Sequence, residues 1–156
     1  MAENILSVQD LHTSFTTDHG EVMAVNGVTF NLEEGKTLGI VGESGSGKSV
    51  TAYSIMQILA STGKVVKGEI LFNGENILNY NKKQMDEFRG EKCSIIFQDP
   101  MTSLNPTFTV GWQLREALRL HTQYKTRSAA NRRAIELLEM VGVNEPESRI
   151  KQYPFE

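Results

Sequence analysis

Hydrophobic and polar residues alternate loosely over the first part of the chain, in two segments that are rich in β-forming residues. These segments are residues 5–15 and 22–32, and a polar turn separates them. The pattern predicts two antiparallel strands, the second of which is interrupted at Asn26-Gly27. Both strands precede the glycine-rich loop described below, and we expect them to form an antiparallel ribbon.

Short apolar runs predict four further strands: residues 38–41, 69–72, 75–78 and 94–97. The first of them has the continuous apolar character of a buried parallel strand. The second and third flank Asn73-Gly74, the strongest short hairpin signal. Residues 61–68 carry no strand pattern and are predicted to be a linker.

Apolar residues recur at helical spacing in several later segments. Ala52, Ile55, Met56 and Leu59 fall on one face of a predicted helix. Further helical segments or turns are predicted at residues 82–89, 114–121, 127–141 and 149–153. Gly90 and Gly142 follow two of these segments as C-terminal stops. The chain is therefore strand-rich up to Gln98 and helical after it.

The junction between the apolar run 38–41 and the helix after it carries the candidate chemistry. Its sequence, GESGSGKS, fits G-x-x-x-x-G-K-[ST], the phosphate-binding loop pattern. Glycines let backbone N–H groups approach phosphate oxygens, and the following helix points its N-terminus at the same anion. Lys48 adds a positive charge, and the Ser49 hydroxyl is placed to bind Mg²⁺. The residues predicted to bind nucleotide here are Gly42, Glu43, Ser44, Gly45, Ser46, Gly47, Lys48, Ser49 and Val50.

Gln98 ends the predicted strand 94–97. In open α/β sheets the ligand lies at the carboxyl ends of the strands, where a polar side chain can reach the phosphates and the metal bound by Ser49. A solvated loop residue is an equally good interpretation of Gln98 from the sequence alone.

Length, net charge and cysteine content limit the kinds of protein that this chain can be. The chain has 156 residues, enough for one domain with a core, and a net charge of −3, which argues against a protein built around nucleic-acid phosphates. Cys93 is the single cysteine, so an internal disulfide is excluded and a reducing compartment fits. No apolar run approaches the ~20 residues that span a bilayer.

These motifs, in this order, resemble the ATP-binding subunit of an ABC transporter. The run FQDPMTSLNP, which begins at Phe97, resembles the dipeptide, oligopeptide and nickel importer branch and is far more specific than the phosphate loop. The resemblance implies an α/β fold: a P-loop NTPase (RecA-like) core with an N-terminal antiparallel β subdomain and the start of a helical subdomain. It implies a division into residues 1–98, the ATP-binding core, and 99–156, the Q-loop and part of the helical subdomain.

The resemblance also implies roles that the residues alone do not show. Phe15 occupies the place of the aromatic residue that stacks on adenine. Gln98 is the Q-loop glutamine, which with Ser49 contacts Mg²⁺ and links the site to the membrane subunit. The implied cofactors are ATP and Mg²⁺. The implied partners are transmembrane permease subunits, a second ATP-binding subunit and, indirectly, an extracytoplasmic solute-binding protein, at the cytoplasmic face of the membrane and without nucleic acid.

The sequence departs from the family pattern at its C-terminal end. The LSGGQ-type signature, the Walker B strand with its acidic residues and the switch histidine are not found in the 156 residues. We therefore expect an N-terminal fragment that binds ATP weakly or not at all and does not hydrolyse it. A strand edge left open by the missing Walker B strand predicts weak stability or self-association.

Two other kinds of protein fit part of the sequence pattern. A different P-loop enzyme, such as a small-molecule kinase, would use arginines after the loop, and Arg127, Arg132 and Arg133 are present, although nothing marks them as catalytic. A soluble, non-transport ABC ATPase is the other alternative. The importer-like run that begins at Phe97 argues against a kinase. Together with the lack of a basic patch, it also argues against the DNA-repair type of soluble ABC ATPase.

Overall fold

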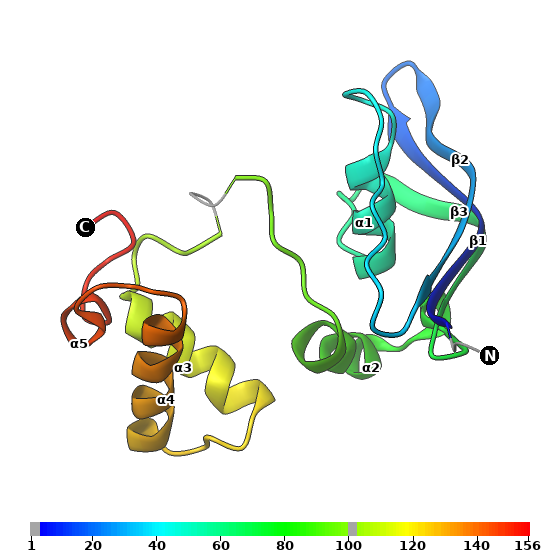
Figure 1. Ribbon diagram of the computed structural model, residues 1–156. Coiled ribbons are helices and arrows are strands. Elements are labelled where there is room, and N and C mark those ends of the chain that lie inside the picture. Colours follow the sequence, from blue (N-terminus) through cyan, green and yellow to red (C-terminus); the bar gives the residue numbers. More distant parts are fainter. Residues whose placement is uncertain (1–3, 100–102) are drawn as a thin grey trace. The chain divides into compact units, whose positions relative to one another are not determined.

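The computed structural model of the protein describes residues 4–99 and 103–156 (Figure 1). The chain divides into two compact units, one up to Asp86 and the other from Glu87 onward. The functional division after Gln98 stays a prediction. Each unit is described by itself.

The first unit is built on a four-stranded antiparallel sheet in the order β2-β1-β3-β4. The predicted ribbon is confirmed as β1 (Asn4–Thr17) and β2 (Gly20–Glu33). The linker predicted over residues 61–68 is wrong, because β3 (Gly63–Phe72) begins at Gly63 and pairs with β1 along its length. Tertiary pairing here overrides weak local strand propensity.

The apolar residues of this sheet make its core, and Val8, Leu11 and Ile70 are fully buried. Helix α1 (Lys48–Met56) lies beside the sheet and contacts β1, β2 and β3 (Figure 1). This packing brings the start of α1, and the loop before it, to the strands of the ribbon.

The ribbon is irregular where the sequence predicted an interruption. Strand β2 continues through Asn26-Gly27, but Leu11 pairs with Val28 and His12 with Asn26, so Gly27 is the extra residue of a β-bulge. The predicted interruption is therefore a bulge with Gly27 at a φ of 76°.

The hairpin at Asn73-Gly74 is confirmed. Both residues have positive φ, 48° and 82°, as a tight type I′ turn requires. The strand after it is shorter than the predicted residues 75–78, because β4 covers only Glu75–Asn76. The Asn76 side chain accepts a hydrogen bond from the Leu78 backbone N–H and starts a 3₁₀ turn, η1 (Ile77–Asn79).

The two other predicted strands, residues 38–41 and 94–97, are wrong as strands in this structure. Neither segment pairs with any strand of the described residues. Their apolar side chains are open to solvent: Val41 is 93% exposed and Ile96 is 97% exposed. A strand needs a neighbour for its backbone N–H and C=O groups, and an apolar run does not supply one.

The second unit is helical. It contains α3 (Val110–His121), α4 (Arg127–Met140) and α5 (Pro146–Arg149), and α3 and α4 lie side by side (Figure 1). Their core consists of Leu118, Ala130, Ala134 and Ile150. Both long helices start at threonine N-caps, and Gly142, with φ 78°, follows the end of α4 as predicted.

Several predicted helix boundaries are wrong; α3, for example, begins at Val110 rather than at Leu114. Gly90 does not stop a helix: α2 (Lys82–Glu87) runs into a π-helical turn, η2 (Phe88–Lys92), that contains Gly90. A Cβ at Gly90 would lie 2.1 Å from the His121 ring, so glycine permits this close contact. The final turn begins at Pro146 rather than Arg149, because proline suits the first position of a helix.

Candidate functional site

The glycine-rich loop leads directly into α1, as predicted. Gly47 is the last residue before the helix and has a φ of 91°. A Cβ at this position would lie 2.6 Å from the Ala24 carbonyl oxygen. Both the backbone conformation and the contact with β2 therefore require glycine.

The contact with Ala24 arises from a second bulge in the ribbon. Thr13 pairs with Val25 and Ser14 pairs with Met23, so Ala24 is the extra residue on β2. Sequence reasoning missed Ala24, and nothing in the local sequence marks it. The bulge is visible only once the strand register is known.

Lys48 holds the loop together at its open side. Its ammonium group donates hydrogen bonds to the Gly42 carbonyl oxygen at 2.8 Å, the Glu43 carbonyl oxygen at 2.6 Å and Ser46 Oγ at 3.3 Å. A positive charge is thereby fixed beside the loop backbone. An anion in the loop would meet this charge at close range.

The start of α1 adds a second favourable element for an anion. The helix has no side-chain cap at its N-terminus and no acidic residue in its first turn. The first N–H groups of a helix have no intrahelical partner and carry the positive end of the helix dipole. Ser49 lies in this first turn and is exposed. The arrangement suits phosphate binding.

The rest of the loop is open to solvent: Gly42, Glu43, Ser44, Gly45 and Ser46 are all exposed. Gly45 has a φ of 82°, which favours glycine. Val50 is half-buried in the first turn of α1. The structure thus brings the predicted loop residues together in one segment, whereas their individual contacts to a nucleotide stay predictions.

Polar side chains anchor α1 to the sheet. Ser54 and Thr13, both buried, join their hydroxyls at 2.8 Å, and Thr51 Oγ1 donates to the Gly47 carbonyl oxygen at 2.9 Å. The helix ends at Met56, where Gln57 turns left-handed with φ 49°, so the predicted extension to Leu59 is wrong. The predicted apolar face missed Thr51 and Ser54, because a hydroxyl can be buried when a partner satisfies it.

Phe15 lies on β1 beside Gly63 of β3. A Cβ at Gly63 would lie 2.6 Å from the Phe15 ring, so the ring covers that glycine and is half-buried. Phe15 is two residues from Thr13, which holds α1. The phosphate loop and Phe15 therefore belong to one sheet-and-helix assembly, and the adenine contact of Phe15 stays a prediction.

Gln98 is exposed and belongs to the second unit, whereas the phosphate loop belongs to the first. Its contact with Mg²⁺ stays a prediction. The family-specific run after it includes Pro100, Met101 and Thr102, which lie outside the described residues.

The Ser49 hydroxyl fits a magnesium ion that arrives with nucleotide. Mg²⁺ is commonly bound through one or two protein oxygens, substrate phosphates and water. In the described part of the chain, no group of three or more His, Cys, Asp or Glu side chains could hold a metal ion by itself.

Comparison with known families decides between the P-loop classes. A protein-family model described as ABC transporter matches residues 25–156. The chain belongs to the ABC transporter family. The match includes the phosphate loop, α1 and the whole helical unit, so the ABC family accounts for most of the chain.

Proteins similar to this ABC chain include ATP-binding proteins of peptide transport. It is 50% identical over 153 residues to the oligopeptide transport ATP-binding protein OppD of Bacillus subtilis, with 97% of this chain and 42% of the relative covered. It is 51% identical over 153 residues to the dipeptide transport ATP-binding protein DppD of the same organism, covering 97% and 45%. The chain thus spans less than half the length of these relatives.

Solved structures support the ABC fold. A dimeric bacterial ABC transporter cassette superposes with a TM-score of 0.81 at 21% identity, covering 96% of this chain and 62% of the other. The ABC protein cbiO1 of Clostridium perfringens gives a TM-score of 0.66 at 24% identity, covering 97% and 54%. Among the helices of the described residues, none combines the length and the apolarity that crossing a bilayer requires.

Proposed function

We propose that this chain is the ATP-binding part of the ATPase subunit that energises an ABC importer of peptides. The observation that carries the proposal is the loop in which Lys48 lies against the backbone before an uncapped helix N-terminus. The relatives OppD and DppD, which are ATP-binding proteins of oligopeptide and dipeptide transport, support peptides as the transported solute.

In this proposal the chain's residues bind and orient the triphosphate. Lys48 exchanges its loop partners for phosphate oxygens, the first-turn N–H groups of α1 donate to the same phosphates, and Phe15 stacks on adenine. Bound Mg²⁺ would neutralise charge on the phosphates, with Ser49 and Gln98 as its protein ligands.

Hydrolysis in this proposal requires residues beyond these 156. The sequence contains no LSGGQ-type signature, and a second ATP-binding subunit would present one across the nucleotide. The Q-loop and the helical unit contact the transmembrane permease subunits at the inner face of the membrane, and the solute-binding protein acts through them. The 156 residues alone bind ATP weakly or not at all and do not turn it over.

Calorimetric titration with Mg-ATP tests the binding step, together with an assay of phosphate release. Lys48→Ala removes a charge-assisted interaction of about 1.5–3 kcal/mol, so any measurable affinity should fall about tenfold or more. Lys36→Ala, in the exposed turn before the loop, is the charge-matched control and should leave affinity unchanged.

The outcomes separate the parts of the proposal. Binding that depends on Lys48, without phosphate release, supports an intact loop on an incomplete catalytic unit. ATP turnover that Lys48→Ala removes would contradict the expected inactivity, and transfer of phosphate to a small molecule would favour a kinase. Binding that Lys48→Ala and Lys36→Ala weaken equally would argue against the loop as the site.

A further inference from the structure

The helical unit contains a cavity of about 630 Å³ beside α3 and the connection to α4. Its wall carries four cationic side chains, one carboxylate and the indole of Trp112. The cations are Arg115, Arg119, Lys125 and Arg127, and the carboxylate is Glu116. All of these residues belong to the second unit, whereas the phosphate loop belongs to the first.

Neutral groups hold three of these cations in place. Arg115 Nη1 donates to Asn131 Oδ1 at 2.9 Å, and Arg119 Nε donates to the Lys125 carbonyl oxygen at 3.3 Å. Lys125 Nζ donates to the Arg119 carbonyl oxygen at 2.9 Å. Within the described residues, none of the ion pairs involves these side chains or Arg127. The cavity therefore has a positive wall that is ordered but not neutralised.

The position of Arg127 increases this positive potential. Arg127 is the first residue of α4, which has no acidic residue in its first turn. A cation at a helix N-terminus meets the positive end of the dipole, where an anion would be favourable. The pKa of the Arg115 guanidinium is lowered by burial and by its neighbour Arg127. The arrangement is unfavourable by itself, and an anion between these groups would relieve it.

Two carboxylates face this region. Glu116 lines the same cavity, and Glu147 lines an adjoining one with Arg115 and Arg127. Neither forms an ion pair with a described cation. Cations outnumber carboxylates on this wall, so a ligand with more than one negative charge suits it best.

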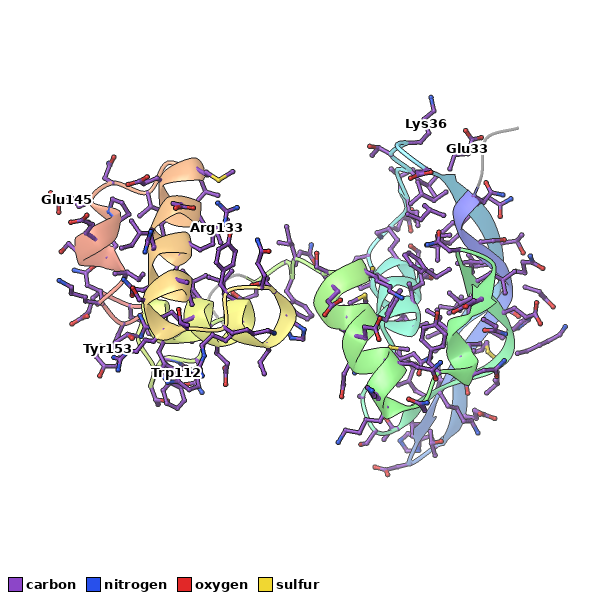
Figure 2. All side chains as sticks on the ribbon, turned by 90° about the horizontal axis from the view of Figure 1, so that it is seen from below. Glu33, Lys36, Trp112, Arg133, Glu145 and Tyr153 are labelled. Atoms are coloured by element: carbon purple, nitrogen blue, oxygen red, sulfur yellow. The ribbon has the colours of Figure 1, made fainter. Side chains whose placement is uncertain are left out.

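Trp112 gives the cavity an apolar wall. The indole is 40% exposed and stacks on Phe108, with ring centroids 4.2 Å apart. Figure 2 shows Trp112 projecting outward from α3. An exposed aromatic face beside arginines can contact the organic part of a ligand while the guanidinium groups hold its charged part.

We propose that this cavity binds a phosphate-bearing anion, whose phosphate is held by Arg115 and Arg127 and whose organic group contacts Trp112. Arginine suits this role because its planar group donates two parallel hydrogen bonds to phosphate oxygens. The ligand is either a soluble phosphate compound or the headgroup of an anionic phospholipid. The shared chemistry is the phosphate.

Trp112 is the single tryptophan of the chain, so intrinsic fluorescence reports on this cavity directly. The experiment uses the full chain with Lys48→Ala, which disables the phosphate loop, and titrates inorganic pyrophosphate. A parallel arm uses vesicles of phosphatidylglycerol and, for comparison, of phosphatidylcholine. Both fluorescence titrations use a protein whose phosphate loop is already disabled, so failure of the loop to bind ATP would not affect them.

Arg127→Gln is the diagnostic variant, because Arg127 is exposed and its removal leaves the core intact. It should weaken the apparent affinity about tenfold or more, the effect of losing one charged partner of the anion. Lys83→Gln removes the same charge from an exposed position of α2 and should change nothing. Circular dichroism checks folding, and Arg119→Gln provides a second variant at the cavity.

A saturable fluorescence change with pyrophosphate alone would support a soluble ligand. A response to phosphatidylglycerol but not phosphatidylcholine vesicles would support a lipid headgroup. The absence of a saturable change in both arms would overturn the proposal. Equal weakening by Arg127→Gln and Lys83→Gln would also overturn it, because that result is expected from net charge alone.

Discussion

Gly47 connects two parts of the first unit at a single residue. Its left-handed backbone ends the loop and starts α1, and its missing side chain leaves room for the Ala24 carbonyl on the bulged strand β2. The loop is therefore positioned against the ribbon by a contact between Gly47 and Ala24 that any Cβ would block. The shape of the proposed phosphate site depends on this contact.

Gly47→Ala should destabilise the protein and remove nucleotide binding. The left-handed backbone alone costs about 1–2 kcal/mol for a residue with a Cβ, and the contact with Ala24 adds to it. Gly45→Ala is the matched control, because Gly45 has a φ of 82° but no atom within 4 Å of the added Cβ. Urea unfolding of both variants measures the difference, and equal losses would show that the Ala24 contact is unimportant.

Asp10 shows how charge is arranged on the ribbon. Its carboxylate lies 2.7 Å from Lys67 Nζ and 2.9 Å from His12 Nε2. The pKa of Asp10 is lowered mainly by the hydrogen bond from Lys67 and, to a smaller extent, by the hydrogen bond from His12. A carboxyl group with a lowered folded-state pKa stabilises the fold above its unfolded pKa, and this contribution is lost as the pH falls through the folded value.

The free energy of unfolding should therefore decrease on acidification below the ordinary pKa of an aspartate, and Asp10→Asn should make this decrease less steep. Unfolding by urea at a series of pH values measures the slope. Asp18→Asn, in the exposed turn between β1 and β2, is the control and should leave the slope unchanged. Identical slopes for the native protein and Asp10→Asn would exclude a contribution from the Asp10 cluster.

Buried hydroxyls fix α1 on the sheet. Ser54 Oγ lies 2.8 Å from Thr13 Oγ1 and also donates to the Val50 carbonyl oxygen at 2.7 Å. The helix is short, so this contact with β1 helps to determine where its N-terminus points. The position of the helix, and with it the geometry of the proposed anion site, thus depends on Thr13.

A double-mutant cycle of Thr13→Val and Ser54→Ala should give a coupling free energy of about 1 kcal/mol, the usual net value of a buried hydrogen bond. Thermal or urea unfolding of the four proteins measures it. Thr16→Val, an exposed position on the same strand, should change stability little. Additive effects of Thr13→Val and Ser54→Ala would show that the two hydroxyls do not stabilise each other.

Two apolar segments of the described chain lie outside the sheet. Residues 38–41 and 94–97 carry exposed apolar side chains such as those of Val41 and Ile96. Such segments favour chain-to-chain association. Self-association of this kind is the behaviour that the sequence predicts.

Sedimentation velocity over a range of concentrations should therefore show association of the protein, and the double variant Val41→Lys, Ile96→Lys should reduce it. Charged residues in an exposed apolar segment discourage its association with another chain. Val141→Lys, at the 76% exposed end of α4, is the matched control. A native protein that is monomeric at all concentrations would contradict the prediction.

The sequence was most informative where structure is determined locally. The Asn73-Gly74 turn, the ribbon strands, α4 with its stop at Gly142 and the start of α1 at the loop follow from nearby residues. The failures concern features that depend on distant partners. The strand status of residues 38–41, the early start of β3 at Gly63 and the buried Ser54 each depend on which segment lies opposite.

Lys48 would have to give up hydrogen bonds within the loop before it could bind a phosphate. The carbonyl oxygens of Gly42 and Glu43 compete with a phosphate for the ammonium group, because a phosphate must displace them to accept the same hydrogen bonds. The affinity for nucleotide would then reflect the difference in free energy between the hydrogen bonds of Lys48 to phosphate and its hydrogen bonds to the loop carbonyls. Lys48→Arg, whose wider guanidinium cannot converge on the same oxygens, would leave the loop both charged and poorly shaped.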